Sequence, residues 1–175
     1  MDFSQIKTGD ILGVSCDGFF WSIVKQVQRA GGLYGFYQYT HIGVAYWADD
    51  VLYSVEMDGE DNVMRPLPQH INLGREVAVF PSPVGTDAMK AQFAKATADS
   101  ISYAWLDYIS IGLRMIFGVH VGFDPDTSSD MVCSTFASRW LQWAGWKAPA
   151  TLPAVASPAE LCKALGTPGI ILNKV

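Results

Sequence analysis

Residues 41–57 read HIGVAYWADDVLYSVEM, and this stretch decides the fold that the sequence predicts. Its two ends, His41 to Trp47 and Val51 to Met57, are rich in the β-branched and aromatic residues that favour strands. The polar segment between them is short enough for a hairpin turn, so the stretch predicts two neighbouring antiparallel strands.

The position of the turn determines which residues face each other across this hairpin. A two-residue turn at 48–49 places His41 opposite Glu56, because directly opposed residues point to the same side. A turn at 49–50 instead places Gly43 opposite Glu56 and His41 on the diagonal, at roughly 7–8 Å. A three-residue loop would put His41 and Glu56 on opposite faces. Either two-residue turn therefore brings an imidazole and a carboxylate together, and such a carboxylate can fix the tautomer of the ring.

The rest of the chain predicts a single α+β domain. Apolar periodicity and turn residues indicate further strands at residues 11–14 and 77–81, helices at 19–30, 86–102, 104–118 and 133–144, and another helix from residue 158. This order is typical of an α+β fold with a small antiparallel sheet. No internal repeat or low-complexity linker interrupts the sequence, so residues 1–175 are expected to form one domain.

Cys133 lies at the predicted start of a helix, three residues after Asp130 and four after Ser129, both polar. A polar N-cap there would place the thiol in the first turn, where unpaired N–H groups and the helix dipole favour the nucleophilic thiolate. A free cysteine alone is more often a buried apolar side chain. The helix start and the His–Glu hairpin together favour a catalyst. Gly43 and Ala45 are small, so we expect this helix to pack on the face of the hairpin that carries His41.

The remaining cysteines and histidines give weaker signals. Cys162 follows a capping box but has apolar neighbours, so a packing role is expected. Cys16 precedes Asp17, whose charge would raise the pKa of the thiol, which is the wrong direction for a nucleophile. His70 and His120 lie in predicted loops and are alternative bases.

Composition excludes several classes of function. Half of the 175 residues are hydrophobic and 17% are charged, which argues against disorder, and a net charge of −5 argues against nucleic-acid binding. No metal or other cofactor is expected, because the three histidines are scattered and Cys-x-x-Cys is absent. The apolar segment 104–121 carries too many charges for a transmembrane helix, and its face with Trp105, Ile109, Leu113 and Ile116 is expected to be core.

The cellular compartment is predicted from the lack of a secretory signal and from the cysteine pattern. No secretory signal opens the chain, and three cysteines without a pairing pattern fit a reducing environment, so a cytoplasmic protein is expected. Packaging in a phage particle or release by lysis is compatible with the same observations. The oligomeric state is not predicted.

Four segments, in this order, resemble a known family. Gly9-Asp10-Ile11-Leu12, Thr40-His41-Ile42-Gly43-Val44, Glu56 and Cys133-Ser134 resemble the circularly permuted papain-like cysteine hydrolases of the NlpC-type superfamily. The chain is similar to the YiiX/YaeF-like amidases and more distantly to the lecithin:retinol acyltransferases, in which the histidine also precedes the cysteine. The resemblance spans residues 6–145.

The resemblance implies a papain-like fold, with a small antiparallel sheet or half-barrel packed against helices. It implies that Cys133 is the nucleophile, His41 the general base and Glu56 the residue that orients His41. The backbone N–H of Cys133 is one candidate donor to the oxyanion. Tyr103 is a second candidate, and Tyr39 lies in an aromatic loop that could wall the substrate cleft or cap the core.

The expected activity is hydrolysis of an amide bond through an acyl-enzyme, as in a cysteine peptidase or amidase. Members of the family act on peptidoglycan peptides or on lipid acyl groups, so the substrate is expected to be a peptide, a peptidoglycan peptide or an N-acyl compound. Two alternatives stay open. One is a lipid acyltransferase or thioesterase that uses the same three residues, and the other is a non-catalytic structural module, such as a virion-associated protein, on the same fold.

Overall fold

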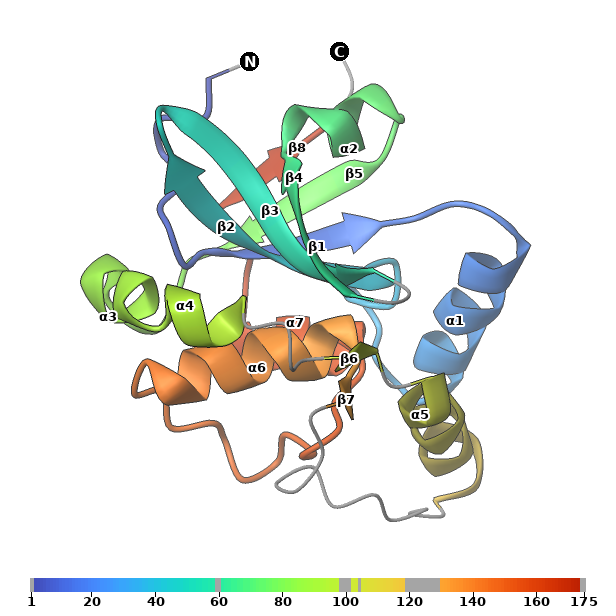
Figure 1. Ribbon diagram of the computed structural model, residues 1–175. Helices are drawn as coiled ribbons and strands as arrows, with labels where there is room; N and C mark the ends of the chain where they lie inside the picture. Colours follow the sequence, from blue (N-terminus) through green and yellow to red (C-terminus); the bar gives the residue numbers. More distant parts are fainter. Residues whose placement is uncertain (1, 59–60, 98–101, 104, 119–129, 174–175) are drawn as a thin grey trace.

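The computed structural model describes residues 2–58, 61–97, 102–103, 105–118 and 130–173. These residues form an α+β protein in which helices pack against an open, six-stranded antiparallel sheet of order β4-β3-β2-β1-β5-β8 (Figure 1). The strands are β1 (Ile11–Ser15), β2 (His41–Ala48), β3 (Val51–Asp58), β4 (Asp61–Pro66), β5 (Glu76–Phe80) and β8 (Ile170–Leu172), while β6 (Ser102–Tyr103) and β7 (Asp130–Met131) form a separate parallel pair.

Seven helices are found in the described part of the chain. They are α1 (Phe19–Ala30), α2 (Pro68–Asn72), α3 (Thr86–Ala91), α4 (Phe93–Ala96), α5 (Trp105–Phe117), α6 (Cys133–Trp143) and α7 (Pro158–Leu165). None of these described helices combines the length and apolarity needed to cross a bilayer.

The hairpin of β2 and β3 adopts one of the two predicted registers. Asp49 and Asp50 have positive φ angles of 45° and 62°, as a tight two-residue turn between antiparallel strands requires. Val44 pairs with Val55, and one further step along the ladder sets Gly43 opposite Glu56. His41 therefore lies on the diagonal from Glu56, on the same face.

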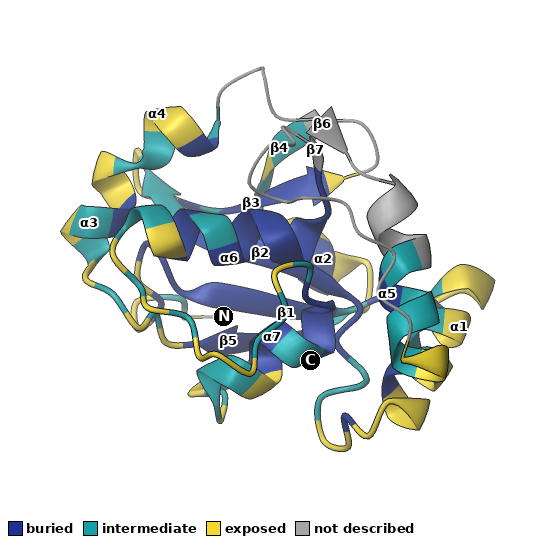
Figure 2. Cartoon of the chain, turned by 90° about the horizontal axis from the view of Figure 1, so that it is seen from below, coloured by how far each residue is buried: buried dark blue, intermediate teal, exposed yellow. Residues whose placement is uncertain are grey.

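The sheet is buried on both faces by different helices. On one face, Ile42 and Val44 join a core cluster with Phe136 and Trp140 of α6. On the other face, Leu12 and Val14 of β1 pack in a second cluster with Leu67 and Ile71, at α2. Figure 1 shows α6 below the sheet and α2 above it, and Figure 2 shows that much of α6 is buried.

The predicted packing of α6 on the His41 face is wrong. That helix covers the opposite face, which carries Ile42 and Val44. The small residue Gly43 serves a different purpose, because a Cβ atom there would lie 2.0 Å from Ser54 Oγ and 3.7 Å from Glu56 Oε2. The space above Gly43 is therefore filled by the neighbouring strand's own polar side chains.

Replacement of Gly43 by alanine is expected to lower the free energy of unfolding by about 1–3 kcal/mol, because the new methyl overpacks this site. The double variant Gly43→Ala/Ser54→Ala should recover part of the loss, since it removes the closest clashing atom. Urea unfolding of both variants and of Ser54→Ala alone measures the coupling. A single Gly43→Ala variant as stable as the parent would contradict this assignment.

The predicted helix at 86–102 is broken within its described part. The structure has α3 ending at Ala91 and α4 beginning at Phe93, and residues 98–101 lie outside the described part. The carbonyl oxygen of Met89 accepts hydrogen bonds from Trp140 Nε1 at 3.0 Å and from the N–H of Gln92 at 3.2 Å. These partners replace the regular i to i+4 bond from Phe93, so a tertiary contact interrupts the helix.

Candidate active site

The side chains of His41 and Glu56 are in direct contact at the open end of the β2–β3 hairpin, away from its turn. His41, the first residue of β2, is 7% exposed, and Glu56 of β3 is 1% exposed. The distance from His41 Nε2 to Glu56 Oε2 is 2.6 Å, a short hydrogen bond typical of charged partners. A carboxylate only accepts, so Nε2 of the ring donates, and Nδ1 is left for another partner.

That partner is Cys133. Its side chain is fully buried and hydrogen-bonds the His41 imidazole. Although α6 covers the opposite face of the sheet, Cys133 is its first residue and His41 begins β2, so the two side chains meet where both elements start. The structure thus brings together the three residues that the sequence singles out.

The charges of this cluster support one another. Burial alone would lower the pKa of His41, but the Cys133 sulfur and the Glu56 carboxylate outweigh it and raise that pKa well above its usual value. Burial likewise opposes ionisation of Glu56, yet His41 and His70 hold the pKa of Glu56 well below its usual range. The protonated imidazole between sulfur and carboxylate favours the thiolate, which is the nucleophilic form of cysteine.

The start of α6 differs in detail from the prediction. Its N-cap is Val132, with an extended backbone and no capping side chain, so the expected polar N-cap is wrong. Residues Asp130–Met131 form β7 instead, paired in parallel with β6, which draws them away from the helix. Cys133 nevertheless lies in the first turn, as predicted, at the positive end of the helix dipole.

Arg65 and His70 lie against the second oxygen of the Glu56 carboxylate, and Arg75 contacts His70. Arg65 Nε and His70 Nε2 are 3.2 Å and 3.3 Å from Glu56 Oε1, and both contacts are off the line of a good hydrogen bond. The positive charge of Arg65 attracts the carboxylate at this distance. Arg75 Nη1 lies 3.1 Å from His70 Nδ1. Because a guanidinium only donates, His70 Nδ1 accepts, and its Nε2–H is directed to the Glu56 side. His70, an alternative base in the sequence, therefore supports Glu56 in the structure.

A small polar cavity of about 40 Å³ adjoins His41 and Glu56 and is also lined by Cys16 and Trp21. The ring centroids of Trp21 and His41 are 6.5 Å apart in an edge-to-face arrangement. Burial raises the pKa of Cys16, so this thiol is held in its protonated form despite its position near His41.

The other predicted residues lie elsewhere. Tyr39 is buried against Phe80, with ring centroids 5.6 Å apart, and does not line the cavity at His41. Cys162 of α7 is fully buried in the core, where burial raises its pKa well above the usual value. The backbone of Tyr103 lies in β6, but its side chain and the whole of His120 fall outside the described part of the chain.

Two comparisons with known proteins give no match to this chain. No protein-family model matches it, and no curated protein matches it either. The activity assigned below therefore depends on the geometry at Cys133.

Proposed function

We propose that this protein is a cysteine-dependent hydrolase that cleaves an amide bond through an acyl-enzyme. One observation carries the proposal: Cys133 contacts His41, and His41 Nε2 lies 2.6 Å from Glu56 Oε2. A nucleophile beside a base that is itself oriented by a third group is the general arrangement of covalent acyl transfer.

In the proposed mechanism, the Cys133 thiolate attacks the carbonyl carbon and forms a C–S bond. The developing oxyanion accepts from the backbone N–H of Cys133, at the positive end of α6. The protonated His41 gives its Nδ1 proton to the leaving nitrogen, so the C–N bond breaks and an amine departs. His41 then takes a proton from water, whose oxygen attacks the thioester, and the acid and the thiolate are released. Glu56 holds the ring throughout.

The proposed activity goes together with a more specific fold than the α+β class. We assign the chain to a permuted papain-like fold of the NlpC type, with the His41 strand before the Cys133 helix. In support, a helix with cysteine as its first residue packs on an antiparallel sheet whose adjacent strands carry histidine and glutamate.

Chemical labelling tests the activation of the sulfur. Cys16, Cys133 and Cys162 are all at most 2% exposed, so exposure favours none of them. A substoichiometric amount of iodoacetamide is expected to modify Cys133 first, because Cys133 hydrogen-bonds the imidazole of His41, whose pKa is raised, whereas burial raises the pKa of Cys16 and of Cys162. Peptide mass spectrometry should also find slower labelling in His41→Ala. Equal modification of the three cysteines in folded protein would contradict the proposal.

The two alternative functions differ from the hydrolase in whether Cys133 is acylated and in what happens to the acyl group. A lipid acyltransferase or thioesterase would form the same Cys133 adduct and differ in the bond cleaved and in the acceptor of the acyl group. A non-catalytic, virion-associated module would form no adduct at all. Intact mass after incubation with N-acyl, ester and thioester substrates, and with peptidoglycan fragments, distinguishes these cases.

A further inference from the structure

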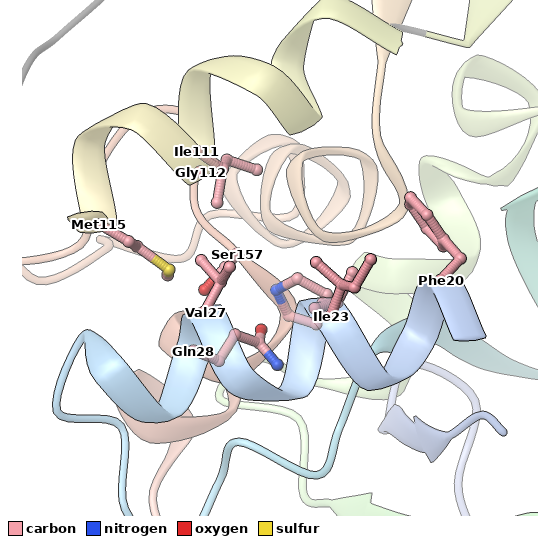
Figure 3. Close-up of a pocket in the computed structure, with 10 residues that line it drawn as sticks. Phe20, Ile23, Val27, Gln28, Ile111, Gly112, Met115 and Ser157 are labelled. Atoms are coloured by element: carbon pink, nitrogen blue, oxygen red, sulfur yellow. The ribbon is translucent and has the colours of Figure 1, made fainter. Parts of the chain in front are cut away.

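An apolar groove runs between α1 and α5 (Figure 3). It has a volume of about 170 Å³ and is lined mainly by Phe20, Ile23, Val27, Ile111, Gly112 and Met115. For scale, an engineered cavity of about 150 Å³ lined by apolar side chains binds benzene. The groove therefore has room for a hydrocarbon segment of several carbons.

The polar groups at the base of this groove are already engaged within the protein. Gln28 donates to the carbonyl oxygens of Tyr37 and Tyr39, and its own side-chain oxygen accepts from the N–H of Ala159. Ser157 Oγ accepts from the N–H of Glu160 in a capping box. A ligand in the groove would thus find apolar contacts and few hydrogen-bonding groups, which disfavours a polar peptide.

The two helices that form the groove carry exposed apolar side chains. On α1, Phe20 and Ile23 are 45% and 47% exposed, and on α5, Ile116 and Phe117 are 54% and 69% exposed. The predicted core position of Ile116 is therefore wrong, because no described element covers that end of α5. Clustered exposed apolar residues around a concave site are typical of a binding surface.

Two contacts connect the groove to the proposed active site. Ile111 and Met115 pack with Val132, the residue that directly precedes Cys133. On the other side, the ring of Phe20 lies 5.0 Å from that of Trp21, which in turn lies 6.5 Å from His41. The groove thus borders the neighbours of both the nucleophile and its base.

We propose that this groove binds the unbranched aliphatic chain of the acyl group that Cys133 attacks. The inference rests on the proposed function and narrows it, because the substrate becomes a long-chain acyl amide or ester in place of a peptidoglycan peptide. Each methylene buried in the groove should raise kcat/KM by about fourfold until the groove is filled.

Gly112 allows a direct test. No atom lies within 4 Å of a Cβ built at this position, and leucine is the better helix former, so Gly112→Leu should fold while it fills the groove. Gly85, also open around its Cβ and away from the groove, provides the matched control Gly85→Leu. The substrates are p-nitrophenyl acetate and p-nitrophenyl octanoate, the latter used below its micellar concentration.

The parent protein is expected to prefer the octanoyl ester by roughly tenfold or more, on the same area argument. Gly112→Leu should abolish that preference by lowering octanoyl ester cleavage roughly tenfold more than acetyl ester cleavage, while Gly85→Leu behaves as the parent. Cys133-dependent cleavage of both esters at equal rates would overturn the acyl groove but not the thiol chemistry. An equal loss on both esters in Gly112→Leu would also overturn the groove.

Binding without turnover separates the two proposals. The fluorescent fatty acid cis-parinaric acid should bind saturably to Cys133→Ala protein and lose that binding in Cys133→Ala/Gly112→Leu. If neither ester is cleaved, the hydrolase proposal fails, and this measurement alone decides the groove. Absence of saturable binding, or equal binding by both variants, would then overturn it.

Discussion

Replacement of Cys133 by alanine is expected to lower kcat/KM by roughly 10⁴-fold or more, because covalent catalysis is lost and members of such a unit are not additive. The residual rate should be close to that of a protein that only binds and polarises the carbonyl. Turnover of p-nitrophenyl acetate and the intact mass of the trapped acyl-enzyme provide the measurements. The adduct should be absent from the variant.

Cys162→Ala is the matched control for this experiment. Both sulfurs are fully buried within helices, so both substitutions remove one core atom and should reduce stability by similar amounts, about 1–2 kcal/mol. Only Cys133→Ala should lose turnover, with a far-ultraviolet circular dichroism spectrum like that of the parent. A folded Cys133→Ala protein that keeps its parent's activity would exclude the proposed nucleophile.

Local sequence predicted the hairpin well, because its information is contained in neighbouring residues. The alternation along β2 and β3 set the faces, and a two-residue turn restricted the register to two choices. The positive φ angles at Asp49 and Asp50 select one of them. Aspartate tolerates this backbone conformation better than most residues, so the signal was present in the sequence.

The surroundings of Glu56 were not predictable in the same way. Arg65 lies in β4, whose sequence DNVMRP contains proline and few β-branched residues, so it did not read as a strand. Such a segment is tolerated because β4 is at the edge of the sheet. His70 and Arg75 follow β4 in the sequence. His70 reaches Glu56, and Arg75 reaches His70, only because of the path that the chain takes back across the sheet. Contacts between residues that are distant in the sequence leave no pattern among neighbouring residues.

The side of the sheet that α6 covers was also hidden from the sequence. Small residues at Gly43 and Ala45 have two explanations, a helix packed on them or bulky polar neighbours across the strands. The structure has the second, with Ser54 and Glu56 above Gly43. The predicted reason for the meeting of Cys133 and His41, a helix packed on the His41 face, is therefore wrong. In the structure the two residues meet because each begins its element.

Glu56→Gln is expected to lower the free energy of unfolding by about 3 kcal/mol, since it breaks a buried charge cluster. Four N–H or O–H groups lie around the carboxylate: His41 Nε2 and Ser54 Oγ hydrogen-bond Oε2, and Arg65 Nε and His70 Nε2 lie 3.2 Å and 3.3 Å from Oε1. Two of these groups face each oxygen. A glutamine amide has an NH2 group in place of one oxygen, so on that side its N–H groups would point at other N–H or O–H groups. Asp58→Asn is the control, because Asp58 is half-exposed and pairs with Arg65, and its loss should cost less than about 1 kcal/mol.

The pH dependence of Glu56→Gln distinguishes an orienting carboxylate from a merely structural one. The lowered pKa of Glu56 adds stability that is present above its usual value of 4.5 and is lost as pH falls through the folded value. The raised pKa of His41 adds stability that is present below 6.5 and is lost as pH rises through its folded value. Without the carboxylate, the pKa of His41 falls, so the alkaline limb of kcat/KM should move to lower pH and turnover should drop by roughly 10²–10⁴-fold. An alkaline limb that stays in place while stability falls would show that Glu56 supports the fold without acting on His41.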